Sequence, residues 1–415
     1  MLLYNFFLLL YRSAIGLSAT YNEKARLWID GRKNWESRYK ELIPQGKKRI
    51  WIHCASLGEF EQGRPLIELM RKKWPDHRIL LTFFSPSGFE TCKNFKGADE
   101  IVYLPMDGSA NAAAFLDIAG PSLAIFIKYE FWHYFLHELK SRNIPTLLTT
   151  ATFRKEQIFF RWYGKLFRKM LNCFSQIHVQ DKTSVDLLES IGISDNVHIT
   201  GDTRYDRVTA ISASLRPIEQ AEKFKGNQRV LVCGSTWPTD EVLISKSVSA
   251  LPQEWKIIIA PHEIDEKHIL QIESTFSGIT ARFSMLDADA SNYQKRILII
   301  DNIGMLSSLY AYGNIAYVGG GFQKGGIHNT LEPAIFGLPV IIGPVYRKFV
   351  EAAELVNRKA AFVANDEVDL KKLLSVLASN DEQRDNVKRD LAKFMAEKTG
   401  AADRIIAQIE ASKLL

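Results

Sequence analysis

The sequence GGGFQKGGIHNTLEPAIFGLPVIIGP occupies residues 319–344 and directly follows a short apolar run at residues 314–318. The run is suited to a buried parallel strand, and the three glycines after it allow the backbone to approach a ligand closely. A helix is then expected to open at residues 327–330 and to end near Phe336, with Gly337 as its C-cap. A strand, a glycine loop and a helix in this order predict a phosphate-binding unit of an α/β sheet.

Several residues of this stretch have the chemistry to hold a nucleotide. Gly325 and Gly326 are expected beside a phosphate, and His328 and Asn329 at the helix start, where backbone N–H groups and the helix dipole favour an anion. Glu332 lies in the first turn, where a carboxylate can accept from ribose hydroxyls. A glycine-rich turn with an ordinary helix cap is the alternative interpretation.

The rest of the chain continues the α/β pattern from residue 49 onward, and it does so twice. The expected strands of the first half are 49–53, 78–83, 100–103, 123–127, 146–149, 176–179 and 197–200, with helices at 60–73, 130–141 and 183–191. Those of the second half are 229–233, 255–260, 297–300, 314–318, 340–342 and 361–363. The polar segment 210–226 between the halves is expected to be a linker or a linking helix. The pattern predicts two Rossmann-like domains.

Ligands of such sheets bind at the carboxyl ends of strands, so the loops there are the candidates for further contacts. In the second half, Ser235 and Thr236 precede an expected helix and can donate to a phosphate, or simply cap that helix. Pro261 and His262 end the next strand, where the imidazole can contact a phosphate or base or be structural. The loop at residues 301–306 is a candidate for holding a nucleobase edge.

In the first half, the loop at residues 54–60 combines Ser56 and Gly58 in a tight turn with Glu59 at a helix start. The helix dipole favours the ionised carboxylate, and an exposed carboxylate that is charged at neutral pH can take a proton from an acceptor hydroxyl. A first-turn glutamate that only stabilises its helix is the alternative. Two other loops carry Glu130 and Arg204; Arg204 is a candidate for neutralising a departing phosphate, with a surface salt bridge as the alternative.

The bulk composition is that of an ordinary soluble globular protein, with 46% hydrophobic and 24% charged residues in 415. On charge alone, the net charge of +6 allows nucleic acid, and an anionic membrane surface or a phosphorylated substrate fits equally well. No nucleic acid partner is expected. The four cysteines form no CxxC pair, so buried free thiols are expected rather than disulfides or a metal site.

The N-terminus begins MLLYNFFLLL, and Arg12 interrupts the apolar run soon afterwards. The run is shorter than the ~20 residues that span a bilayer, and no basic segment precedes it as in a signal peptide. An interfacial anchor is expected, with a helix packed on its own domain as the alternative. The basic residues behind it are Lys24, Arg26, Arg32, Lys33, Arg38, Lys40, Lys47, Lys48 and Arg49.

Taken together, these motifs resemble those of the 3-deoxy-D-manno-octulosonic acid (Kdo) transferases of lipopolysaccharide synthesis. Residues 55–59 match an ASxGE turn, residues 130–132 part of an ExELWP-like segment and residues 201–206, loosely, GNxKFD. Residues 234–236 match a GSTH-like loop. Residues 325–333 match GGHNxLEP with Ile327 inserted, and residues 337–344 complete the match with GxPVxxGP.

The resemblance implies a GT-B fold, in which two Rossmann-like domains face a central cleft, and an inverting transfer that needs no metal or other cofactor. It implies CMP-Kdo as donor and a lipid A precursor as acceptor, at the cytoplasmic face of the bacterial inner membrane. Glu59 would be the general base, and Arg204 stands where the family usually has Lys. The implied CMP contacts are Pro261, His262, Ile303, Gly304, Met305, Leu306, Asn329, Thr330, Leu331 and Glu332.

The expected division is a membrane-associating segment at 1–35, an acceptor domain at 36–208, a nucleotide-sugar domain at 209–395 and a C-terminal helix at 396–415 near the domain junction. Three departures from the family pattern, Lys128, His262 and Met305, put the donor contacts in doubt. Two other functions therefore stay open: a GT-B enzyme that uses a UDP-sugar and a lipid acceptor, and a relative that binds nucleotide sugars without catalysis.

Overall fold

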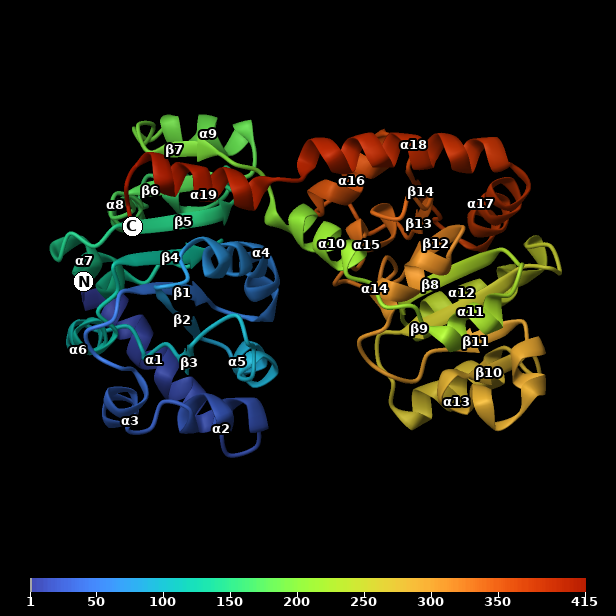
Figure 1. The fold of residues 1–415 in the computed structure, drawn as a ribbon, viewed down its shortest axis with the longest axis horizontal. Coiled ribbons are helices and arrows are strands. Elements are labelled where there is room, and N and C mark those ends of the chain that lie inside the picture. Colours follow the sequence, from blue (N-terminus) through green and yellow to red (C-terminus); the bar gives the residue numbers. More distant parts are fainter. Residues whose placement is uncertain (1) are drawn as a thin grey trace. The chain divides into compact units, whose positions relative to one another are not determined.

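The computed structural model describes residues 2–415, with side chains from Tyr4 onward, and the chain divides into two compact units. The first unit is Met1–Arg207 with Lys398–Leu415, and the second is Val208–Glu397. Each contains a seven-stranded sheet in which all pairings are parallel (Figure 1). The two parallel sheets predicted from the sequence are confirmed.

The first sheet has the strand order β3-β2-β1-β4-β5-β6-β7. Its strands are β1 (Arg49–Cys54), β2 (Arg78–Phe83), β3 (Glu100–Tyr103), β4 (Leu123–Ile127), β5 (Thr146–Ala151), β6 (Gln176–Val179) and β7 (Val197–Ile199). The helices of this unit are α1 (Leu2–Ser18), α2 (Glu23–Asp30), α3 (Trp35–Leu42), α4 (Leu57–Lys73), α5 (Pro86–Cys92), α6 (Ser109–Ala119), α7 (His133–Ser141), α8 (Lys165–Leu171), α9 (Lys182–Glu189) and α19 (Ala401–Ala411), with a 3₁₀ turn η1 (Ile158–Phe160).

Helices cover both faces of this sheet, because its strands are apolar on both sides. Along β1, Ile50 and Ile52 join the core beneath α4, α5 and α19, whereas Trp51 joins the core on the opposite face with α6 and α7. This is the expected packing of a doubly wound sheet, in which side chains alternate between two buried layers.

The second sheet has the order β10-β11-β9-β8-β12-β13-β14. Its strands are β8 (Val230–Thr236), β9 (Lys256–Pro261), β10 (Thr280–Arg282), β11 (Ile297–Ile299), β12 (Ile315–Val318), β13 (Val340–Ile342) and β14 (Ala361–Val363). The helices are α11 (Glu219–Lys225), α12 (Pro238–Ser247), α13 (Glu266–Thr275), α14 (Leu306–Leu309), α15 (Leu331–Ala334), α16 (Val350–Asn357), α17 (Glu367–Ser379) and α18 (Asp381–Lys398). The 3₁₀ turns are η2 (Val248–Ala250), η3 (Phe283–Ala288), η4 (Ala290–Gln294) and η5 (Tyr310–Tyr312).

Each sheet has one point where the strand order reverses. In the first it lies between β1 and β4, and in the second between β8 and β12. Loops diverge there to opposite faces and leave a crevice at the carboxyl ends of the strands, which is where ligands of open α/β sheets bind. Glu59 lies in α4 shortly after β1, Glu130 in the loop after β4, Ser235 near the end of β8, and the glycine-rich stretch after β12.

The sequence placed most strands within one or two residues. The segment 210–226, expected as a linker or a linking helix, is largely helical, because α10 (Thr203–Ala213) extends into it and α11 follows. Other elements differ from expectation. Strand β10 was not predicted, since only three residues pair at this sheet edge. Strand β8 continues to Thr236 instead of ending at 233, and α7 begins at His133 instead of 130.

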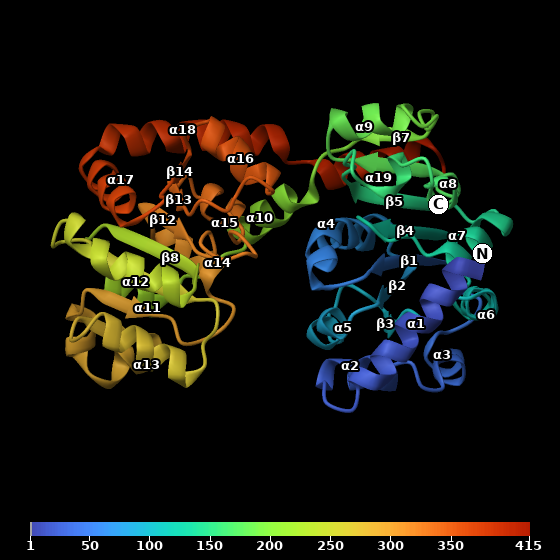
Figure 2. The same cartoon turned by 180° about the vertical axis from the view of Figure 1, so that it is seen from behind.

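The N-terminal region forms three helices, α1, α2 and α3, on the first unit (Figure 2). Helix α1 is fixed by the Tyr4 hydroxyl, which donates to Asp107 (2.6 Å), while Phe6, Leu9 and Leu17 are exposed. Among the described residues, no helix is long and apolar enough to cross a membrane. The first residue of the expected membrane-associating segment, Met1, lies outside the described residues.

Two residues of the expected basic surface are structural instead. Arg32 is largely buried, donates to the carbonyls of Phe84 and Leu104 (2.8 Å each) and stacks on Trp28, and burial lowers its pKa to about 10. Arg49 is buried beside Glu100, 3.7 Å away. Among the cysteines, all four are buried free thiols.

Candidate active site

The loop after β1 places Glu59 in the first turn of α4, where its carboxylate is half-buried. Oε2 of Glu59 accepts from the backbone N–H of Ser56 (3.0 Å) and contacts the Ser56 hydroxyl. This is the glutamate arm of a capping box, so Glu59 stabilises the start of α4. Both contacts fall on Oε2, and no described residue hydrogen-bonds to Oε1, which leaves one oxygen able to accept a proton.

Glu130 lies in the loop after β4 and is the centre of a hydrogen-bonded cluster. The Trp132 indole N–H donates to its Oε2 (2.7 Å), and Nε2 of the buried His53 is 3.3 Å from the same oxygen. Glu130 was expected inside a helix. It instead lies in the loop before α7, where Lys128 takes a left-handed conformation (φ +70°). The helix predicted to start at 130 was therefore wrong by three residues, and Glu130 gains a fixed position in the loop.

His53 lies between Thr82 and the Glu130–Trp132 pair. The Trp51 indole N–H donates to the Thr82 hydroxyl oxygen (2.8 Å), and the same oxygen lies 2.8 Å from Nδ1 of His53. On the other side of the ring, Nε2 lies 3.3 Å from Oε2 of Glu130 and 3.2 Å from the Trp132 indole nitrogen. The buried imidazole and the Trp132 indole therefore position the Glu130 carboxylate from inside the core.

Arg204 is at the start of α10 and is paired with Asp202. Its guanidinium lies 2.7 Å from the Asp202 carboxylate, and its backbone N–H donates to the same side chain (2.9 Å). The Arg204 side chain remains about 31% exposed. The salt bridge foreseen as an alternative is present, and the partial exposure still allows the guanidinium to meet an anion.

Two contacts join the start of α10 to the helix that carries Glu59. The buried Thr203 hydroxyl donates to the carbonyl of Gln62 (2.6 Å), and Arg207 pairs with Glu61 (2.6 Å). Gln62 and Glu61 lie within one turn of Glu59 on α4. The structure therefore connects the Arg204 loop with the N-terminal half of α4.

In the second unit, Ser235 and Thr236 were expected in a loop that donates to a phosphate, but they form the end of β8. The Thr236 hydroxyl is buried and donates to Glu241 (2.8 Å), so it faces inward. Ser235 is half-buried, with φ +53°, at an irregularity of the β8–β9 ladder. Ser235 is thus the hydroxyl of the pair that stays partly accessible, because Thr236 is used to fix the strand end.

Three aromatic rings stack beside this loop. His262 lies 4.6 Å from the Trp237 ring and 4.4 Å from the His328 ring, centroid to centroid. The Trp237 indole N–H donates to Nε2 of His328 (3.1 Å), so the neutral His328 ring carries its proton on Nδ1. Burial, followed by the charge of His262, lowers the pKa of His328 to about 4. His328 is consequently neutral at pH 7.

The glycine-rich loop after β12 is packed too closely for other residues. A Cβ on Gly319 would lie 2.3 Å from the Ser235 carbonyl oxygen, and one on Gly321 would lie 2.5 Å from the Gly343 nitrogen. The N–H of Gly320 donates to the buried Asp240 carboxylate (2.9 Å). The glycines thus bring the loops after β8, β12 and β13 together at the point where the strand order reverses.

The helix expected to begin at 327–330 is only α15, the four residues Leu331–Ala334. The N–H groups of Ile327 and His328 donate to the carbonyls of Val345 and Gly319, which holds this segment in a non-helical path. The predicted start of the helix was therefore wrong, and a helix this short gives weak dipole support for an anion at His328 and Asn329.

Glu332 is instead connected to the loop after β11. The Ser307 hydroxyl donates to Oε2 of Glu332 (2.7 Å), and the Asn329 side-chain amide donates to Oε1 (3.0 Å). Asn329 is exposed and also caps the N–H of Leu331 (3.0 Å). Two of the loops expected to contact a nucleotide are therefore joined by direct hydrogen bonds.

The remaining expected contact residues differ in accessibility. Gly58, His262, Ile303, Gly304 and Gly325 are exposed, whereas Pro261, Gly326, Thr330 and Leu331 are buried. Met305 and Leu306 are half-buried and pack on the core below the loop. The buried members can support a ligand loop from beneath but offer it little surface.

Sequence comparison gives the family. The family profile described as 3-deoxy-D-manno-octulosonic-acid transferase (kdotransferase) matches residues 33–207. The 3-deoxy-D-manno-octulosonic acid transferase of Rickettsia felis is 30% identical over 349 residues, covering 80% of this chain and 72% of that protein. The Haemophilus influenzae protein of the same name is 28% identical and covers 94% and 93%. The chain belongs to the 3-deoxy-D-manno-octulosonic acid transferase family.

Membership of the Kdo transferase family makes this chain a glycosyltransferase. Solved structures of similar fold include UDP-GlcNAc 2-epimerase from Neisseria meningitidis, with a TM-score of 0.64, 14% identity and coverage of 88% of this chain and 100% of that one. A putative UDP-N-acetylglucosamine 2-epimerase from Listeria monocytogenes gives a TM-score of 0.62 at 13% identity, covering 88% and 97%. At these identities the likeness shows the fold alone, and that fold is of the GT-B kind.

Three residues of this candidate site were missed from the sequence. His53, Trp237 and Ser307 contact candidate residues that are distant in the chain. Position was a signal for two of them, because His53 is near the end of β1 and Trp237 directly follows β8, whereas Ser307 lies in α14. Position alone does not distinguish such residues from ordinary core or cap residues.

Proposed function

We propose that this Kdo transferase moves Kdo from CMP-Kdo to a lipid A precursor in lipopolysaccharide synthesis, with inversion at the anomeric carbon. The observation that carries the proposal is Glu59, a half-buried carboxylate with one oxygen held by its helix start and the other open, in a member of this family. Such a group is oriented and can act as a base.

The proposed reaction needs one proton transfer and one substitution. Glu59 takes the proton of an acceptor sugar hydroxyl, whose oxygen attacks the anomeric carbon of Kdo while the bond to the CMP phosphate breaks. CMP departs with the electron pair, and the Arg204 guanidinium and Ser235 hydroxyl offset the charge that builds on its phosphate. Glu130, held by His53 and Trp132, orients the acceptor.

The nucleotide is assigned to the loops of the second unit. Asn329 and Glu332 would bind ribose hydroxyls, and the stacked rings of His262 and Trp237 offer an aromatic surface beside them. Met305 and His262 depart from the family pattern. Met305 is close in sequence to Ser307, which hydrogen-bonds to Glu332, and His262 stacks on His328. These contacts support a donor site in the same position as in the family, with different side chains at these two residues.

Membrane association is proposed for α1, whose exposed apolar residues suit insertion into the interface of the inner membrane at its cytoplasmic face. Exposed lysines and arginines on α2 and α3 would attract anionic headgroups. This would hold the enzyme where its lipid acceptor lies.

The decisive experiment is a single-turnover assay with CMP-Kdo and a lipid A precursor, alongside UDP-sugars with the same acceptor. We expect transfer from CMP-Kdo and not from the UDP-sugars. The melting temperature should rise with CMP and change little with UDP. Transfer from a UDP-sugar would instead identify a different GT-B transferase. Nucleotide binding without any transfer would identify a non-catalytic relative.

A further inference from the structure

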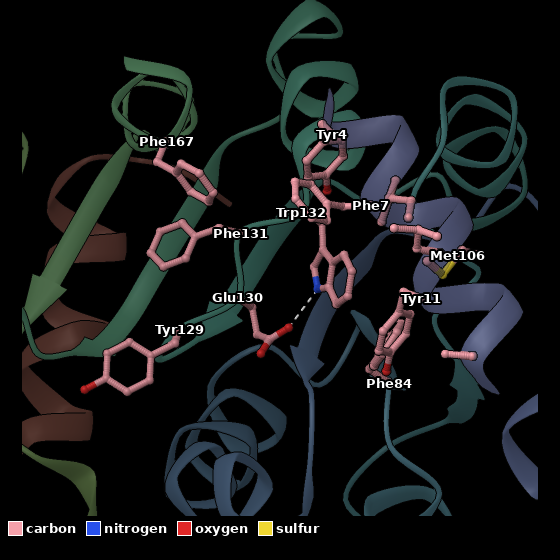
Figure 3. A pocket seen from close by; sticks show the side chains of 13 residues that line it. Tyr4, Phe7, Tyr11, Phe84, Met106, Tyr129, Glu130, Phe131, Trp132 and Phe167 are labelled. Atoms are coloured by element: carbon pink, nitrogen blue, oxygen red, sulfur yellow. Dashed lines mark hydrogen bonds between the residues drawn. The ribbon is translucent and has the colours of Figure 1, made fainter. Parts of the chain in front are cut away.

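A large apolar cavity lies in the first unit, beneath helix α1 and beside the loop that carries Glu130. Its volume is about 770 Å³, within the range of roughly 300–1,000 Å³ typical of small-molecule sites. Its walls come from α1, from Phe84 after β2, from Phe131 and Trp132 after β4, and from Phe167 on α8. Figure 3 shows Phe131 and Phe167 on one side of Trp132 and Phe84 on the other, with the Glu130 carboxylate between Phe131 and Trp132.

The helix that covers the cavity is held in place by specific contacts. The Tyr4 hydroxyl donates to Asp107 (2.6 Å), and the Tyr134 hydroxyl on α7 donates to Asn5 (2.7 Å). Further along α1, the Tyr11 ring stacks on Phe84 at 6.1 Å. Helix α1 is therefore held against the first unit at Tyr4, Asn5 and Tyr11, so the wall that it contributes to the cavity has a fixed position.

The lining suits a long apolar chain better than a polar ligand. The polar groups of Tyr4 and Trp132 already have partners, Asp107 and Glu130. A sugar or nucleobase would meet polar partners only at the Tyr11 and Tyr129 hydroxyls and at Glu130, and its other donors and acceptors would lie against apolar walls, which costs affinity. A hydrocarbon chain has no such groups, and each methylene it buries strengthens binding roughly fourfold.

Two parts of the lining differ in a way that fits a lipid. One is Glu130, which follows β4 and is bound to His53 of the adjacent strand β1, so it lies at the carboxyl edge of the sheet, where Glu59 also follows β1. The other is α1, whose apolar residues Phe6 and Leu9 are exposed. A chain in the cavity would thus contact both the reacting edge and the helix with a membrane-seeking surface.

We infer that this cavity binds one acyl chain of the lipid acceptor and so selects acylated over chain-free acceptors. The inference rests on the proposed function for the identity of the acceptor. The chain would anchor the lipid while its sugar lies near Glu130, so binding energy from a part of the substrate remote from the reaction would position the attacking hydroxyl.

The test fills the cavity from α1 without removing any of its walls. Ala14 lines the cavity and is exposed, so Ala14→Trp can place an indole in the space. Ser13 is its exposed neighbour on the same helix and does not line the cavity, so Ser13→Trp is the matched control. Each variant is assayed with CMP-Kdo and a lipid A precursor, or with the same compound after chemical removal of all acyl chains.

Ala14→Trp is expected to raise KM for the acylated acceptor by about tenfold or more and to leave KM for the deacylated acceptor unchanged, since a few buried methylenes would be displaced. Ala14→Leu should give a smaller rise, and Ser13→Trp none. Equal effects of both Trp variants, or an equal effect on both acceptors, would overturn the inference. Melting temperatures near the wild-type value exclude misfolding as the cause.

A second measurement does not depend on transfer. A lipid A precursor with a photoreactive diazirine near the end of one acyl chain is bound without donor, illuminated and mapped by mass spectrometry. Labelling on α1 and at residues 129–132, lost in Ala14→Trp, supports the site, whereas labelling elsewhere refutes it. If the wild-type protein transfers Kdo to neither acceptor, the proposed function fails, and this labelling still decides the role of the cavity.

Discussion

Glu59 has two roles that a single substitution can separate. Its Oε2 caps the start of α4 through Ser56, and its Oε1 is the proposed site of proton transfer. A capping box accepts Gln as well as Glu at this position, because the amide oxygen can take the same backbone N–H. A glutamine therefore keeps the structural role and removes the base.

We predict that Glu59→Gln lowers the single-turnover rate of Kdo transfer by about 100-fold or more, the usual scale for a general base. The melting temperature and the affinity for CMP should stay close to wild type. Rates are measured by rapid quench with CMP-Kdo and the lipid acceptor, and CMP binding by calorimetry.

The control for this prediction is another capping carboxylate of the same unit. Asp181 caps α9 by accepting from the N–H of Ser184 (2.7 Å), and it has no place in the proposed mechanism. Asp181→Asn should leave the transfer rate unchanged. A Glu59→Gln enzyme that transfers Kdo at nearly the wild-type rate would rule out Glu59 as the base.

At the scale of elements, the strands were predictable and their functional ends were less so. Buried runs such as Leu123–Ile127 and Gln176–Val179 were placed correctly, because apolar, β-branched stretches of this length suit parallel strands. The glycine loop was also recognised, since only glycine tolerates the close approach of Gly319 to the Ser235 carbonyl.

The errors have a common physical cause, which is competition from distant partners. The expected helix after Gly326 shrinks to Leu331–Ala334, and the N–H groups of Ile327 and His328 donate to the carbonyls of Val345 and Gly319, which ties this segment to neighbouring loops. Thr236 was expected to face a phosphate but donates to Glu241 on the next helix. Local sequence carries no signal for such tertiary hydrogen bonds. It therefore predicts which loops lie at the site better than it predicts the hydrogen-bond partners of their side chains.

Strand β6 gives a prediction about pH at this scale. His178 is buried in the strand, its Nε2 lies 3.0 Å from the Gln176 side-chain oxygen, and its ring is 5.4 Å from that of His198 on β7. Burial, followed by the nearby His198, lowers the pKa of His178 to about 3. In the unfolded chain a histidine titrates near 6.5. The unfolded state therefore gains a proton below that pH that the folded state cannot accept.

The free energy of unfolding of the first unit should consequently fall as pH drops from about 6.5 toward 3. Above pH 6.5, His178 should make no pH-dependent contribution to it. In His178→Leu the acid-induced loss should be smaller by roughly 2–3 kcal/mol between pH 6.5 and 4.5. Urea unfolding at several pH values measures it, with the slope of the transition checked for constancy. Parallel losses in the two proteins would mean that His178 becomes protonated in the folded state.

At the scale of the whole molecule, the chain does not divide simply into an N-terminal and a C-terminal half. The last residues, Lys398–Leu415, belong to the first unit, where α19 packs on α4. Asp206 accepts from the backbone N–H groups of Gly400 (2.6 Å) and Ala402 (3.2 Å), which fixes the start of α19. The sequence predicted two sheets, but the amphipathic pattern of a terminal helix does not specify which sheet it will cover.

Because Lys398–Leu415 pack on the first unit, we predict that a substitution near the C-terminus destabilises the N-terminal sheet. Ile405 is fully buried in the core beneath α4 and α5, so Ile405→Ala should lower the free energy of unfolding of the first unit by about 2–4 kcal/mol. Hydrogen exchange followed by mass spectrometry should show faster exchange in β1 and α4 and little change in β8 and α12. Glu410→Ala, which removes only an exposed ion pair with Lys73 (2.9 Å), is the control and should cost less than about 1 kcal/mol. Faster exchange confined to the second unit would show that α19 supports that sheet instead.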